Sequence, residues 1–158
     1  MHLNITKTIS LHFYSPTFAA TFFLMMTLHA GDMYVADSTF HVIRFVAANG
    51  TVTPLVGKAG ISGWTPDGPA SSAVLSGPYA LTLMQNGSAL AWTEQGTCVV
   101  RKLDLVTMTV TTVAGVPRGC QFGLNVVGPA LSARFAPNGL LGITAYGSSL
   151  FLSDTGAP

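Results

Sequence analysis

The sequence has 158 residues, of which 49% are hydrophobic and only 8% are charged, with a formal net charge of +1. This balance excludes an intrinsically disordered protein, which combines low hydrophobicity with high charge, and the length fits a single domain. It also excludes a partner bound by charge, such as nucleic acid or an anionic lipid. Such binding needs clustered basic residues, and no basic run is longer than Arg101-Lys102.

Residues 1–30 differ in character from the rest of the chain. Residues 18–28 form an uncharged, mostly apolar run that ends shortly before Ala30. Its length suits the hydrophobic region of a signal peptide and is too short for a membrane-spanning helix. We therefore predict that residues 1–30 are a signal peptide cleaved near Ala30 or a retained anchor. Two alternatives stay open: the run is a β-strand, or the segment is a stray leader joined to a partial gene.

From residue 31 onward the chain repeats itself. The segment YVADS at 34–38, followed by Arg44, returns as AWTEQ at 91–95, followed by Arg101. A third copy begins with FLSDT at 151–155. A period of about sixty residues carried by short β-type runs is typical of a stacked or radial array of β-sheets.

One repeat is complete in the sequence. Its β-branched and alternating runs predict strands at 79–83, 89–93, 99–103 and 110–114, separated by turn residues. We predict an all-β fold, a partial β-propeller of four-stranded antiparallel blades with an incomplete ring, and blade units at about 31–57, 77–115 and 139–158. Two broken units beside a whole one leave faces unpaired, so we expect a fragment, a truncated gene product, or a protomer that completes the propeller by self-association.

The repeated residues resemble an NHL-repeat β-propeller over residues 31–158. The strand at 34–38 matches the family motif, Phe40-His41-Val42 stands at the family's Asn-His-Leu-like triplet, and Arg44 follows in place. The segments DGP at 67–69 and VTTVAG at 110–115 are also typical of the family. The second copy departs from the motif, with Thr97-Cys98-Val99 at the triplet and Glu94 in place of the acid. The resemblance implies the propeller fold, and because propellers host many functions it implies little about activity.

The acidic residues that recur at the repeat period have a structural interpretation. Asp37, Glu94 and Asp154 each end a strand before a tight turn, where a carboxylate accepts turn N–H groups. In a hairpin with a four-residue loop, Asp37 lies diagonal to Arg44, and Glu94 is related to Arg101 in the same way. Such pairs contribute a few tenths of a kcal/mol. We predict scaffolding roles for all five residues.

Two long connectors, residues 57–78 and 115–137, are rich in Gly and Pro and are expected to carry the variable contacts of the array. Trp64 lies in the first connector between a glycine and a proline-containing turn. It is a candidate contact residue for a partner, and the alternative is that it caps the blade beneath it. Trp92 falls in a strand, so we expect it in the core between blades.

Besides the candidate signal peptide, two features favour a secreted or cell-surface protein. Cys98 and Cys120 are candidates for a disulfide, worth about 3 kcal/mol if formed. Asn49 and Asn86 each begin an Asn-Gly-Ser/Thr glycosylation sequon. Asn-Gly is also the preferred dipeptide of tight hairpins, so both sites have a purely structural explanation.

For function, we predict a non-catalytic NHL-type module that binds a protein or glycan partner through its connectors, without cofactor or metal. His41, in a repeat turn, is interpreted as a packing or hydrogen-bonding residue. No spacing of Cys and His indicates a zinc site. The alternatives are a fragment of a metal-dependent propeller enzyme, lyase- or hydrolase-like, and a truncated remnant without function.

Overall fold

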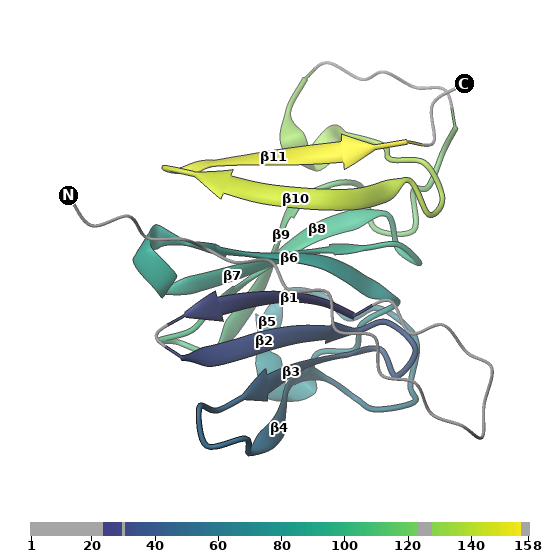
Figure 1. The fold of residues 1–158 in the computed structure, drawn as a ribbon. Helices are drawn as coiled ribbons and strands as arrows, with labels where there is room; N and C mark the ends of the chain where they lie inside the picture. The colour runs from purple at the N-terminus through teal and green to yellow at the C-terminus, as the bar shows by residue number, and fades with distance from the viewer. Residues whose placement is uncertain (1–23, 30, 123–127, 156–158) are drawn as a thin grey trace.

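The computed structural model describes residues 24–29, 31–122 and 128–155, and these form three antiparallel sheets (Figure 1). The described residues contain no α-helix, only short 3-10 turns at η1 (Ala70–Ser72), η2 (Gln85–Gly87) and η3 (Ala130–Ser132). The all-β prediction is therefore confirmed.

Sheet I has the strand order β1-β2-β3-β4. Its strands are β1 (Leu24–His29), β2 (Asp32–Asp37), β3 (Val42–Val46) and β4 (Val52–Gly57). β1 pairs with β2 along its whole length. Sheet I thus begins before residue 31, and residues 24–29 take the strand form that the sequence left as an alternative to a signal segment. The rest of the predicted leader, residues 1–23, lies outside the described residues.

Sheet II is the complete unit. Its strands are β6 (Pro78–Met84), β7 (Ala89–Glu94), β8 (Val99–Asp104) and β9 (Thr109–Ala114). A two-residue strand that the sequence did not predict, β5 (Gly68–Pro69), adds to the edge of β9. Sheet III is a single hairpin of β10 (Leu140–Tyr146) and β11 (Ser149–Asp154).

The repeat is visible in the turns as well as in the strands. His41, before β3, and Cys98, before β8, both have a positive φ, of 58° and 54°. Each stands beside a glycine with positive φ at the end of its sheet's fourth strand, Gly57 or Gly115. A Cβ on Gly115 would lie 2.5 Å from the carbonyl oxygen of Cys98, and one on Gly57 would strike the carbonyl oxygen of His41. The same backbone crossing therefore recurs in both sheets and requires glycine.

The sheets pack face to face, with β6 contacting β1 and β2 on one side and β10 on the other (Figure 1). We call the two faces of each sheet its N-side face, toward the preceding sheet, and its C-side face, toward the next. The N-side face of sheet II, with Trp92 and Leu103 fully buried, packs on Tyr34, Ala36 and Ile43 of sheet I. The alternation of side chains along each strand separates these faces.

The C-side face of sheet II packs in the same way on sheet III. Ala91 and Val100 lie in clusters with Ile143, Leu150 and Leu152 of the hairpin. Small residues on β7 allow this close approach. None of the three sheets closes into a ring among the described residues, so the propeller itself stays a prediction.

Candidate functional site

The first connector is held firmly onto sheet II rather than standing free. Ser62 bridges Leu75 in parallel fashion, and the Leu75 side chain is completely buried. β5 then pairs with β9, and Ala70 N–H donates to the carbonyl of Met108. Residues 58–62 form its longest exposed stretch, and Pro66, Asp67, Pro69, Ser71 and Ser72 are exposed as well. The connector therefore lies against the core and is most exposed at its tip, residues 58–62.

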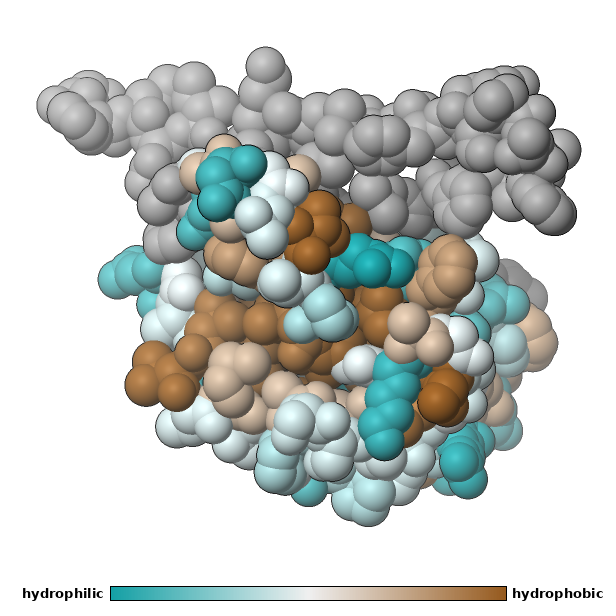
Figure 2. Space-filling model, turned by 90° about the horizontal axis from the view of Figure 1, so that it is seen from below, coloured by the Kyte–Doolittle hydropathy of each residue, from teal (hydrophilic) through white to brown (hydrophobic). Residues whose placement is uncertain are grey.

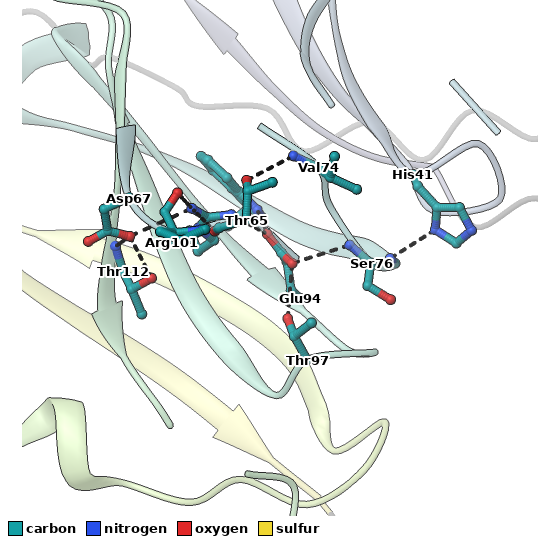
Figure 3. A network of polar contacts seen from close by, with 12 residues as sticks. His41, Thr65, Asp67, Val74, Ser76, Glu94, Thr97, Arg101 and Thr112 are labelled. Atoms are coloured by element: carbon teal, nitrogen blue, oxygen red, sulfur yellow. Dashed lines mark hydrogen bonds and ion pairs between the residues drawn. The ribbon is translucent and has the colours of Figure 1, made fainter. Parts of the chain in front are cut away.

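Glu94, at the end of β7, is the centre of the polar contacts beneath this connector (Figure 3). One carboxylate oxygen accepts the indole N–H of Trp92 at 3.0 Å. The other accepts the hydroxyl of Thr97 at 3.0 Å and the backbone N–H of Ser76 at 3.2 Å. Burial raises the pKa of Glu94, while the nearby Arg101 guanidinium and these hydrogen bonds oppose that rise.

Arg101, on β8, joins Glu94 to the connector. Its Nη1 lies 3.8 Å from Glu94, and its Nη2 donates to the carbonyls of Thr65 and Pro66 at 3.1 and 3.4 Å. The same Nη2 lies 3.6 Å from Asp67, whose carboxylate also accepts the N–H and hydroxyl of Thr112. Arg101 has no exposed side-chain surface. A buried cation therefore fixes the course of the connector across sheet II.

The equivalent pair in sheet I has the same register but different surroundings. Asp37 lies opposite Val42 and 2.8 Å from Arg44, and its carboxylate accepts the N–H of Phe40. The Arg44 and Asp37 side chains keep 31% and 13% of their surface exposed, against none for Arg101 and Glu94. The expected few tenths of a kcal/mol suits Asp37–Arg44. For the fully buried Glu94–Arg101 pair we expect a different magnitude, because desolvation makes both the cost and the attraction much larger.

The third repeated acid and the histidine of the triplet also contact backbone. Asp154, at the end of β11, accepts the N–H of Ala136 at 3.3 Å. His41 accepts the N–H of Gly77 through Nδ1 at 3.1 Å, just before β6 begins. Each side chain ties a strand end to the chain segment that enters the same or the next sheet, which is a structural arrangement.

Trp64, the candidate contact residue of the first connector, lies next to the segment that crosses Arg101. It is partly buried, and its indole N–H is buried with no hydrogen-bond partner among the described residues. Its neighbour Gly63 lies against Val74, and Thr65 accepts the N–H of Val74 through its hydroxyl. The contact role of Trp64 and its capping alternative therefore both stay predictions.

A different group of residues gathers at the tip of the connector, and the sequence did not predict it as a contact surface. Gly60 N–H donates to the carbonyl of Phe40 at 3.0 Å, which joins the tip to the β2–β3 turn. Phe40 and Ile61 are both exposed, and Arg44 lies over the Phe40 ring at 5.8 Å. Lys58 pairs with Ile61 and is also exposed. We call these four residues, Phe40, Arg44, Lys58 and Ile61, the tip cluster. The sequence feature that could have indicated this cluster is an apolar residue in each of two turns, Phe40 before β3 and Ile61 in the first connector.

The second connector is tied to sheet II by a disulfide between Cys98 and Cys120. Arg118 N–H also donates to the carbonyl of Thr97 at 3.0 Å. The sequon residues Asn49 and Asn86 both lie exposed in turns. Among the described residues no group of His, Cys, Asp and Glu is arranged to hold a metal ion. In that same part of the chain, no helix has the length and apolar character to cross a membrane.

No protein-family model matches the chain, and no curated protein matches it. Solved structures do match. A protein of unknown function from Bacteroides thetaiotaomicron VPI-5482 has 21% identity and a TM-score of 0.67, over 78% of this chain and 30% of that one. An auxiliary nutrient binding protein from the same strain has 19% identity and a TM-score of 0.69, over 85% and 35%. An auxiliary nutrient binding protein from Bacteroides ovatus ATCC 8483 has 22% identity and a TM-score of 0.64, over 83% and 34%.

These similarities show the fold. At such identities the likeness extends to the β-rich architecture and not to the residues of a site. The chain spans about a third of the length of each of these structures.

Proposed function

We propose that this chain is part of an NHL-like β-propeller that binds a protein or glycan partner without catalysis, and that it does so through the tip cluster. Sheets I and II are two blades in this proposal, and sheet III is the inner half of a third. The two solved neighbours called auxiliary nutrient binding proteins support a binding role over a catalytic one.

The observation that carries the proposal is how the charged repeat residues are used. Asp37, Glu94, Arg101 and Asp154 all bond to backbone or to neighbouring side chains that hold strands and connectors together. The tip cluster combines an aromatic, an aliphatic and two basic side chains, with the Arg44 guanidinium over the Phe40 ring. Aromatic residues and arginine are enriched at protein interfaces.

We also propose that the protein is secreted or displayed at the cell surface. The Cys98–Cys120 disulfide supports this, because structural disulfides persist in oxidising compartments. The exposed sequon turns at Asn49 and Asn86 are compatible with modification in such a compartment.

The test is a binding screen with paired variants. Purified protein is applied to an array of polysaccharides and, in parallel, to immobilised extracellular proteins of the source organism. Phe40→Asp and Ile61→Asp are each expected to weaken any specific binding at least tenfold. The matched control is Val106→Asp, which changes an exposed apolar residue in the β8–β9 turn, at the opposite end of the strands.

Equal loss in the control variant would refute the tip cluster as the contact surface. Turnover of the bound ligand, or stoichiometric zinc or calcium in the purified protein, would favour the metal-dependent enzyme instead. Binding to the protein array only, or to the glycan array only, decides the class of partner.

A further inference from the structure

The chain contains the same sheet-to-sheet interface twice. In both, the N-side face of one sheet packs on the C-side face of the sheet before it. In sheet II the two faces differ, with Trp92 and Leu103 on the N-side face and Ala89 and Ala91 on the C-side face. Because an N-side face meets a C-side face both times, the interface is directional.

Sheet I has an N-side face that no described sheet covers. Strand pairing places Val52 opposite Val46, as Val110 lies opposite Leu103 in sheet II. Val110 is fully buried, whereas its equivalent Val52 is 53% exposed. Figure 2 views the molecule from the side of sheet I and shows apolar residues gathered in the middle of this face, with polar residues around them. This face has the residue pattern of a packed interface.

Sheet III has a C-side face that is uncovered in the same sense. Strand pairing makes Phe151 the equivalent of Ala91, because Phe151 lies opposite Thr144 and Ala91 opposite Thr82. It also makes Tyr146 the equivalent of Met84, because Tyr146 lies opposite Ser149 and Met84 opposite Ala89. Ala91 and Met84 are buried under sheet III, whereas Phe151 is 57% and Tyr146 is 81% exposed. Two large aromatic side chains on one hairpin face are unusual for a surface that stays in water.

We propose that two copies of this chain associate head to tail, with the C-side face of sheet III in one copy packed on the N-side face of sheet I in the other. The argument is continuity, because the exposed faces are the two halves of an interface that the chain already makes twice internally. Since the faces differ, the contact is heterologous, so copies add in one direction and form a closed ring or a longer chain of subunits. The proposal does not depend on the binding function of the tip cluster.

The experiment uses the full chain and three single variants. Val52→Lys blocks the N-side face, Phe151→Lys blocks the C-side face, and Val106→Lys is the control, since Val106 is 81% exposed in the β8–β9 turn. All three positions are exposed, so circular dichroism is expected to show unchanged β-structure. Sedimentation velocity over a range of concentrations then measures association.

The wild type and Val106→Lys are expected to form dimers and larger species from the 16.4 kDa monomer as concentration rises. Each blocking variant alone is expected to associate at least tenfold more weakly, because every copy lacks the same half of the interface. An equimolar mixture of Val52→Lys and Phe151→Lys is expected to form dimers and to stop there, since one intact face of each kind remains. Tyr146→Lys repeats the test of the C-side face at a second position.

Three results would overturn the proposal. The wild type stays monomeric at all concentrations, only one of the two faces affects association, or the mixture of blocked variants fails to form dimers. The second result would indicate a symmetric contact through one face.

Discussion

Replacing Arg101 tests whether the buried Glu94–Arg101 pair stabilises the fold more than a partly exposed ion pair does. The equivalent pair in sheet I, Asp37–Arg44, provides the control. In Arg101→Met the carboxylate of Glu94 remains in a buried site without its cation, and the connector loses the guanidinium bonds to the carbonyls of Thr65 and Pro66. Removing one partner of a buried ion pair costs about 3–5 kcal/mol. We expect the free energy of unfolding to fall by that amount at pH 8.

The control is Arg44→Met, at the same position of sheet I. Arg44 and Asp37 are partly exposed, so water solvates the remaining carboxylate, and exposed pairs contribute about 0.2–1 kcal/mol. The two substitutions have the same chemistry and the same register. The difference between their effects therefore measures burial.

The assay is urea unfolding of the wild type and both variants at pH 8 and pH 5. Burial raises the pKa of Glu94 and Arg101 opposes that rise, so the pKa rises further in Arg101→Met. Protonation at the lower pH then removes the unpaired charge, and the cost of the substitution is expected to shrink. Adding Glu94→Gln to Arg101→Met is expected to cost less than the sum of the single changes, by about 0.5–3 kcal/mol. Equal costs for Arg44→Met and Arg101→Met would refute the reasoning.

Three further predictions follow from single features. The variant Cys98→Ala/Cys120→Ala is expected to lose about 3 kcal/mol of unfolding free energy, measured against the oxidised wild type. The reason is that the unfolded chain is no longer closed into a loop between cysteines 22 residues apart. An unchanged free energy would show that the bond does not constrain the unfolded chain. Gly115→Ala is expected to lower the free energy of unfolding by more than about 1 kcal/mol, because its Cβ would lie 2.5 Å from the Cys98 carbonyl oxygen. The control is Gly50→Ala, where a Cβ would meet nothing within 4 Å and only the strain of the positive φ is expected. Because the pKa of Glu94 is raised in the native state, the native state holds a proton that the unfolded chain releases. The stability of the wild type relative to Glu94→Gln is therefore expected to fall as the pH rises from 4.5, the ordinary pKa of a glutamate, through the raised native pKa. A difference that stays constant or increases with pH would contradict that sign.

The positions of the strands were predictable from the sequence because they depend on local chemistry. Alternating and β-branched runs indicate β6 to β9, and Asn86-Gly87-Ser88 and Gly96 mark the first two of the turns between them. The register of the β2–β3 hairpin, with Asp37 opposite Val42, follows from a loop of four residues. The repeat then extends the same prediction from one sheet to the next. These features need no knowledge of what packs on either face.

Burial was decided only by the tertiary structure. Asp37–Arg44 and Glu94–Arg101 have the same motif and register, yet only the second pair lies under a connector and between two sheets. The same holds for β5, which is a strand only because β9 has a free edge beside it, and for Trp64, whose indole N–H is buried. The period-2 pattern of a strand tells which side chains share a face. Whether another sheet covers that face depends on chain segments far away in the sequence, and that contact determines whether a charge is exposed or buried.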